Sequence, residues 1–383
     1  MSAAIATRRV DMDYLRVGAL ALLILYHVLS VYDSAEWWRL KSDHAGVWAD
    51  YIIAAISPWR MPIVFFVGGV AAWFMLQRMT LASFARDRAA KLLTAFVFAV
   101  VVLIPPQRYV RLDDFGQPTP DYFTYLIEQA PRALSFHGLG IPDVAHAWFL
   151  PYLFAYSLAA ALFARLAPRT LAALQSFVLR LPIMTVLALV AANFVLDDAV
   201  LAPWKPETRL LFPDITAHVH YGPIFGFGFL VASSSAFRDR LMAARGLLAA
   251  LAATSLIVLL GAKFALLGLG QEQLQPAVGV WRGLYGATML FAILAFAARF
   301  LNTSTPLLAY ATDAILPVYL IHQTTLVLAG DALIPLQFPA AMEFLLLLAS
   351  ALILPLALYH FLVRPFTPLR LAFGLRPKAR SAL

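Results

Sequence analysis

The sequence predicts an all-α protein: a polytopic membrane helix bundle of about ten transmembrane helices, with both termini in the cytoplasm. Three observations predict this fold class. Apolar residues make up 62% of the 383 residues and charged residues 13%, whereas soluble domains hold roughly half and a quarter. Long apolar runs recur along the chain. Basic residues gather in alternate connections between those runs.

The composition also excludes several classes of protein. A chain this apolar is not a soluble enzyme, a disordered protein or a nucleic-acid-binding domain, although its formal net charge is +8. Topology accounts for that excess of basic residues. The sequence has no cysteine, so disulfides, thiolate metal ligands and a thiol nucleophile are excluded together.

Ten segments are predicted to cross the bilayer. A span needs about 20 mainly apolar residues, because about 30 Å of hydrocarbon offers the backbone no hydrogen-bond partner outside the helix. Each candidate is bounded by proline, glycine or charge. In chain order they are residues 15–33, 51–77, 90–106, 146–166, 181–197, 215–235, 246–269, 281–301, 306–329 and 340–363.

Local features distinguish some of these spans. Pro58 and Pro62 interrupt the second, so residues 51–60 could instead form a re-entrant or interfacial piece. The third follows a basic loop, and the fourth and sixth open on histidines. The ninth contains Pro317, which can kink it.

The basic residues give the direction of the spans. Most of the 29 lysines and arginines lie inside if the N-terminus is cytoplasmic, and most loop acids then lie outside. The domain organisation is therefore a cytoplasmic N-terminal segment, 1–14, one transmembrane domain, 15–363, and a basic cytoplasmic tail, 364–383. The transmembrane domain includes a long outside loop, 107–145, which could cover an external site.

His27 is the most informative polar residue, because ionisable side chains inside a span are costly. It lies near the middle of the first span, eleven residues after Arg16, so the two side chains share one helix face to within about 20°. Asp13 is three residues from Arg16 and could pair with it. A buried neutral histidine bonded to a neighbouring helix is the plain alternative, whereas the function-based interpretation is proton transfer near neutral pH.

A basic cluster, Arg86, Arg88 and Lys91, precedes the third span. Arg88 and Lys91 are three apart and share a face. An ordinary positive-inside flank explains the cluster. A phosphate clamp explains it too, because guanidinium groups bind phosphates through two parallel hydrogen bonds.

The outer half of the predicted bundle holds His146, Trp148, His218, His220 and His322. Such residues are typical of an interfacial belt, but several together could line a polar pocket. Zinc could be bound by nitrogen ligands from His146, His218 and His220. An i, i+2 spacing splays helical side chains and no acid completes the set, so no metal site is predicted.

Five short motifs resemble membrane-bound acyltransferase family 3, in the order in which that family has them. They are Arg16-x10-His27, Met61 to Gly69, Arg88-x-x-Lys91, His146 to Leu150, and Pro317 to Gln323. Arg60-Met-Pro and the residues around His27 look closest to the glucans biosynthesis protein C branch, which is similar to glucan succinyltransferases. Two departures stand out. The family usually has Ser-Gly where this chain has Gly68-Gly69, and Arg where it has Lys91, which loses the guanidinium fork.

The resemblance implies a donor side in the cytosol. It makes residues 15–363 an acyltransferase domain of the cell inner membrane, with acetyl-CoA or succinyl-CoA as the donor and no tightly bound cofactor. Arg16, Arg86, Arg88 and Lys91 would hold the donor phosphates.

The resemblance also implies an acceptor side outside, where a hydroxyl group, usually on a carbohydrate, receives the acyl group. His27 would act, assisted by Arg16, as general base or as transient acyl carrier. His146, Trp148 and His322 would shape the acceptor site. Arg60 is a candidate to bind the distal carboxylate of a succinyl group.

Other interpretations stay open. A multi-pass transporter or flippase for an acylated or glycan substrate would also need a polar path, and a scaffold without a small-molecule site is the third alternative. The sequence identifies no protein partner, and it leaves open the acyl group, the acceptor and the oligomeric state. It also leaves open whether transfer is direct or passes through an acyl-histidine intermediate. It assigns no roles to three ionisable residues in the spans, Lys263, Asp313 and Glu343.

Overall fold

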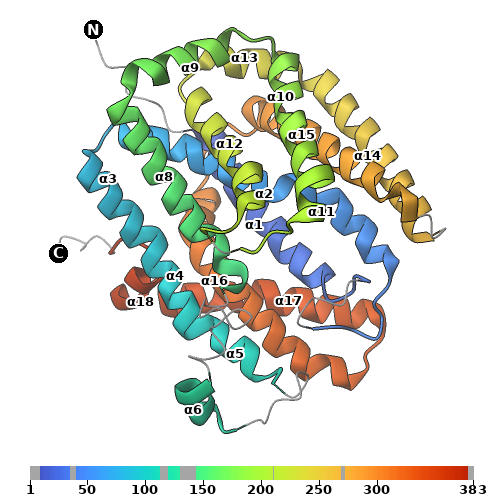
Figure 1. Ribbon diagram of the computed structural model, residues 1–383. Helices are drawn as coiled ribbons and strands as arrows, with labels where there is room; N and C mark the ends of the chain where they lie inside the picture. The colour runs from blue at the N-terminus through green and yellow to red at the C-terminus, as the bar shows by residue number, and fades with distance from the viewer. Residues whose placement is uncertain are drawn as a thin grey trace.

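The computed structural model describes residues 9–34, 40–112, 120–129, 144–209, 211–268 and 272–377. In these ranges the chain is built from helices and contains no strand, which confirms the predicted all-α class. The helices form one bundle, in which α9 and α13 lie across the end where the N-terminus is found (Figure 1).

The long helices follow the predicted spans closely. Their bounds are α1 Val10–Leu29, α2 Val47–Leu76, a run from α3 to α5 over Leu81–Tyr109, η6 and α8 over Ala145–Leu166, α10 to α11 over Ile183–Trp204, α12 Ile215–Val231, α14 Arg245–Gly268, α15 Gln275–Phe300, α16 Pro306–Leu333, and α17 with η10 over Ala340–Val363. Shorter helices are α6 Tyr122–Thr124, α9 Pro168–Arg180, α13 Ser235–Ala243 and α18 Thr367–Ala372.

Eight helices of the described ranges are long and apolar enough to cross a membrane. The count becomes nine if α12 and α13, which are bent by 111° at their junction, form one span. The number is thus below the predicted ten, because α16 is long but is not among the helices that meet this criterion. Cytoplasmic placement of both termini stays a prediction.

The second span differs from the re-entrant alternative that its prolines suggested. Pro58 and Pro62 lie inside α2, which is a continuous helix of 30 residues. A proline removes a backbone donor, and near Pro58 the side chains of Trp59 and Tyr285 both donate to the Ala55 carbonyl, at 2.8 and 2.6 Å. The bond from Tyr285 fastens this turn of α2, one turn before Arg60, to α15.

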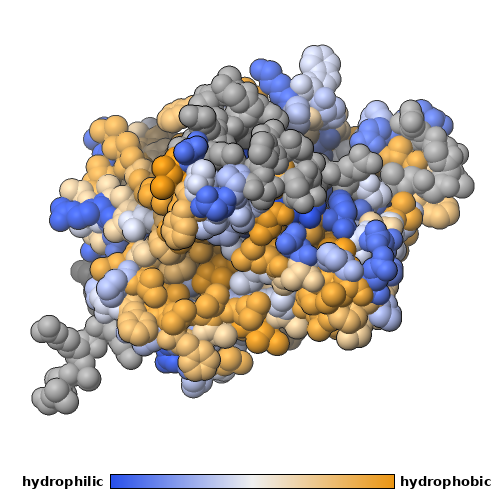
Figure 2. All heavy atoms as spheres, turned by 90° about the horizontal axis from the view of Figure 1, so that it is seen from below, coloured by the Kyte–Doolittle hydropathy of each residue, from blue (hydrophilic) through white to orange (hydrophobic). Residues whose placement is uncertain are grey.

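The apolar side chains are divided between the interior and the surface. Among those that stay exposed are Val97, Val101, Ile257 and Ile353, each more than half accessible. Figure 2 shows hydrophobic side chains covering broad areas of one face of the molecule. Such contiguous apolar surface is expected where helices face lipid.

Two glycines allow α2 and α12 to cross closely. A Cβ atom on Gly69 would lie 2.0 Å from the Phe225 carbonyl oxygen, and one on Gly228 would lie 2.2 Å from that of Phe66. Neither backbone oxygen can turn aside. By contrast, a Cβ atom on Gly68 would meet only the end of the Leu153 side chain, at 2.7 Å.

We therefore expect Gly69→Ala to destabilise the bundle by about 3 kcal/mol, at the upper end of overpacking effects. Gly68→Ser is expected to cost under about 1 kcal/mol, because a flexible leucine can move. The thermal midpoints of both variants in detergent, compared with the wild type, test this. Equal midpoints for the two variants would contradict the close crossing at Gly69.

Candidate functional site

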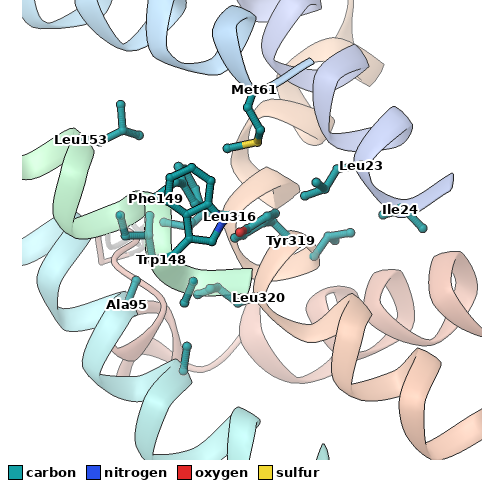
Figure 3. Packing of buried hydrophobic residues seen from close by; sticks show 14 of the residues in the cluster. Leu23, Ile24, Met61, Ala95, Trp148, Phe149, Leu153, Leu316, Tyr319 and Leu320 are labelled. Carbon is teal, nitrogen blue, oxygen red and sulfur yellow. The ribbon is translucent and has the colours of Figure 1, made fainter. Parts of the chain in front are cut away.

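A cavity of about 1300 Å³ lies between the helices. It is lined by side chains from α1, α2, η6, the run from α10 to α11, the segment 205–209, α12, α15 and α16. Figure 3 shows part of the buried packing beside it, where Leu23 of α1, Met61 of α2, Trp148 of η6 and Tyr319 of α16 approach one another. Ligand pockets commonly occupy about 300–1,000 Å³, so this cavity is large enough for a small-molecule ligand.

His27 lies on the wall of this cavity and is 8% exposed. Its Nδ1 atom is 2.8 Å from Nε2 of His322, and the two rings are nearly parallel, at 19°, with centroids 5.0 Å apart. The other ring nitrogen of His322, Nδ1, bonds the Tyr319 carbonyl oxygen. His322 itself is fully buried and is not among the residues that line the cavity.

His146 joins the same cluster from η6. Its ring lies 5.4 Å from that of His322, and its Nε2 atom is 2.9 Å from the Leu320 carbonyl oxygen. The Tyr319 hydroxyl donates to the backbone carbonyl of His146. Three histidines distant in sequence are therefore neighbours, and η6 is tied to the turn of α16 that carries His322.

Arg60 lies on the cavity wall with only 5% of its surface exposed. Its guanidinium carbon is 3.7 Å from the centre of the Tyr26 ring, a cation–π distance. In the described part of the chain, Nε and Nη1 of Arg60 have no hydrogen-bond partner. A buried guanidinium with unpaired donors costs free energy, so the site is ready to receive an anion.

Trp148 lines the cavity but is largely enclosed by aromatic neighbours. It is 7% exposed and packs against Phe65, Tyr152 and Tyr221, with ring centroids 5.4–6.2 Å apart. The ring therefore presents a limited surface to the cavity.

Another part of the cavity wall carries charged residues that the sequence did not assign to a site. Asp197 Oδ2 lies 2.6 Å from His220 Nδ1, and Arg282 Nε donates to Asp198 Oδ1 at 2.7 Å. Glu207, in the loop after α11, accepts a hydrogen bond from Tyr221.

Burial raises the pKa of Glu207, although the nearby His220 and Arg209 oppose that shift. The sequence contained one signal for this wall: acids at the outer end of the fifth span, just before the histidines that open the sixth. Those acids also fit the charge pattern of an outside loop.

The predicted donor-binding cations lie elsewhere. Arg16, Arg86, Arg88 and Lys91 are not among the cavity-lining residues. Arg88 is buried, with Nη2 at 3.4 Å from the Gly68 carbonyl oxygen, whereas Arg86 and Lys91 are exposed.

The charge of Arg16 nevertheless acts on both Arg88 and Lys91, so these three are neighbours. Arg16 also lies 3.8 Å from Asp13, the predicted partner. Eleven residues separate Arg16 from His27, which is about 16 Å along a helix.

Two of the three residues without predicted roles have structural partners. Asp313 accepts from Arg370 at 3.0 Å and from Tyr359 at 2.6 Å, which fastens α18 to α16. Glu343 accepts from Tyr32 at 2.9 Å, which fastens the chain after α1 to α17. Lys263 lies on α14, away from the cavity lining.

The histidines considered for zinc do not form a cluster. In the described ranges no group of three or more histidine, aspartate or glutamate side chains is arranged to hold an ion. His146 and His220 lie instead in separate contacts, with Leu320 and Asp197.

Comparison with protein families gave one result that covers nearly the whole chain. The family model described as "Acyltransferase domain" matches residues 9–360. Neither the comparison with curated proteins nor the comparison with solved structures gave a match.

Proposed function

The chain belongs to acyltransferase family 3, and from this premise we propose that it is a transmembrane O-acyltransferase. It would move an acetyl or succinyl group from cytosolic acyl-CoA to a hydroxyl group of an extracytoplasmic carbohydrate. Family membership and the apolar helices support the coarser statement, a multi-pass membrane acyltransferase. Donor, acceptor and membrane are parts of the proposal.

One observation carries the proposal: His27 lines a large cavity beside Arg60, on the same helix as Arg16. A histidine can accept a proton near neutral pH or carry an acyl group. A buried cation beside it can stabilise negative charge that develops on a carbonyl oxygen. Both properties suit acyl transfer.

The proposed reaction moves one proton from the acceptor hydroxyl to the leaving sulfur. His27 takes the proton of the acceptor hydroxyl as its oxygen attacks the thioester carbonyl. The new carbon–oxygen bond forms, the carbon–sulfur bond breaks, and the proton passes to the sulfur, which leaves as coenzyme A thiol. In the alternative two-step route the acyl group rests on His27 first.

The donor is proposed to bind where Arg16, Arg88 and Lys91 gather, with Arg86 at their edge. Phosphate groups are bound by such clustered cations. Arg16 and His27 are about 16 Å apart along α1. An extended acyl-pantetheine arm would span this distance, with its phosphates at Arg16 and its thioester at His27.

The acceptor is proposed to occupy the cavity. The wall of Asp197, Asp198, Glu207 and Arg282 offers acceptors and donors for sugar hydroxyls. His146 and Trp148 would shape the side nearest His27.

The finer assignment, to a glucan succinyltransferase, depends on Arg60. A succinyl donor has a distal carboxylate, and the unpaired Nε and Nη1 of Arg60 are donors without partners in the described part of the chain. Acetyl transfer needs no such cation.

Purified protein in nanodiscs, incubated with radiolabelled acetyl-CoA or succinyl-CoA, tests the proposal. Thioester hydrolysis, labelled protein or labelled glucan that depends on His27 would support it and identify the donor. Donor binding that is absent for both would favour the transporter or flippase instead.

The donor site makes a separate prediction. Arg88→Ala is expected to raise KM for acyl-CoA about tenfold or more, because a charge-assisted bond to phosphate is lost, with a smaller change in kcat. Lys91→Arg is expected to lower KM, since it restores a guanidinium fork. Titration of acyl-CoA over both variants measures this, with exposed Arg78→Ala as the matched control. Unchanged KM for Arg88→Ala would place the phosphates elsewhere.

A further inference from the structure

We propose that His322 is a positioning residue for His27. It fixes the tautomer in which Nε2 of His27 accepts the substrate proton, and it takes up part of the charge that results. This inference rests on the proposed function and deepens it, because it identifies the reacting atom. It also gives His322 a role different from contact with the acceptor, since His322 is fully buried and outside the cavity lining.

The tautomer of His322 follows from its contact with the backbone. Nδ1 of His322 bonds the carbonyl oxygen of Tyr319. A carbonyl oxygen can only accept, so Nδ1 must carry the hydrogen. In the neutral ring the lone pair then lies on Nε2.

The tautomer of His27 follows in turn. Nε2 of His322 is 2.8 Å from Nδ1 of His27, and with a lone pair on the former, Nδ1 of His27 must donate. The lone pair of neutral His27 is therefore on Nε2. Since the ring lines the cavity, Nε2 is the nitrogen that can take a proton from an acceptor hydroxyl or carry the acyl group.

The same contact can accept charge after the proton is taken. When Nε2 of His27 binds the substrate proton, the hydrogen on its Nδ1 can move across 2.8 Å to Nε2 of His322. His27 is then neutral again, and the His322 imidazolium keeps its bond to Tyr319. The reverse transfer returns the proton for the leaving sulfur.

The surroundings limit the cluster to one such proton. His146 lies 5.4 Å from the His322 ring, and the Arg60 guanidinium, over Tyr26, faces the same cavity as His27. A second positive charge at this separation in a weakly polar interior is unfavourable. Tyr319 and Tyr26 are the neutral neighbours of the pair.

Two substitutions at His322 separate positioning from simple packing. His322→Gln can place an amide oxygen near the position of Nε2 and still accept from His27. His322→Asn has its amide near the position of Nδ1, so it keeps the Tyr319 contact and loses the acceptor. We expect His322→Asn to lower kcat about 100-fold, the lower range of general-base effects, with KM for both substrates nearly unchanged. The kcat of His322→Gln is expected to be at least tenfold higher than that of His322→Asn. The exposed His44→Asn serves as the matched control.

A spectroscopic readout is independent of turnover. In nanodiscs with ¹⁵N-histidine, the His27 signals, identified by their loss in His27→Gln, should show protonated Nδ1 and unprotonated Nε2. In His322→Asn they should move to the other tautomer or to a mixture. This measurement holds even if no tested donor is turned over, so it separates failure of the positioning role from failure of the proposed function.

Three results would overturn the inference. They are a wild-type His27 protonated on Nε2 alone at neutral pH, equal kcat for His322→Asn and the wild type, and equal loss in His322→Gln and His322→Asn with both variants folded and binding donor. Donor binding and size-exclusion profiles identify any misfolded variant. If both variants misfold, the tautomer of wild-type His27 decides alone.

Discussion

His27→Ala is expected to abolish acyl transfer while the variant still folds and binds acyl-CoA. A general base contributes about 10²–10⁴-fold to a rate, and an acyl carrier contributes the whole two-step route, so the loss should be at least about 100-fold. The donor cations lie outside the cavity that His27 lines, so the donor Kd should change less than about threefold. Transfer from labelled acyl-CoA to glucan and equilibrium donor binding measure the two quantities on one preparation.

A second substitution protects this test from a folding artefact. His27→Gln keeps a polar side chain of similar length, with its amide near the position of Nε2, but the amide cannot carry the proton. We expect the same kinetic loss as for His27→Ala. The control is His360→Gln on the exposed end of η10. Full turnover in His27→Gln would show that His27 is neither base nor carrier, and that another group of the site performs the proton transfer.

The sequence was sufficient for most of the fold. Apolar runs bounded by charge predicted each long helix, because lipid requires every span to satisfy its own backbone. Pro58 and Pro62 left a re-entrant alternative open for residues 51–60, because a proline removes a helix donor, but α2 is continuous through both. The 111° bend after α12 coincides with a local signal, because Ser234 caps α13 by accepting from the Phe237 N–H.

The site was predictable in part. Helical periodicity alone placed Arg16 and His27 on one face. The contact between His27 and His322 joins residues 295 positions apart, and no spacing rule could supply it. The wall of Asp197, Asp198 and Glu207 was missed for the same reason, because its partners come from α12 and α15. Pairing across helices is fixed by packing, which a single sequence does not display.

Arg60→Met is expected to lower succinyl transfer at least about 100-fold and at the same time to stabilise the fold. The buried guanidinium keeps Nε and Nη1 without partners in the described ranges, so it costs free energy until an anion binds. Replacing buried charge by an apolar side chain of similar size is often neutral or stabilising by about 1–4 kcal/mol. Loss of activity with a raised thermal midpoint would therefore identify Arg60 as a residue kept for function.

Comparing the loss of turnover with succinyl-CoA and with acetyl-CoA in Arg60→Met shows which group Arg60 binds. If it binds the distal carboxylate, succinyl-CoA turnover falls in Arg60→Met while acetyl-CoA turnover changes little, because only succinate loses an ion pair. If it stabilises the thioester oxyanion instead, both donors lose turnover equally. Arg60→Lys is the matched variant: it keeps the charge but loses the planar fork, so it should retain part of the activity. A destabilised Arg60→Met with normal turnover would mean that the guanidinium serves packing over Tyr26, at 3.7 Å, and that the anion site lies elsewhere in the cavity.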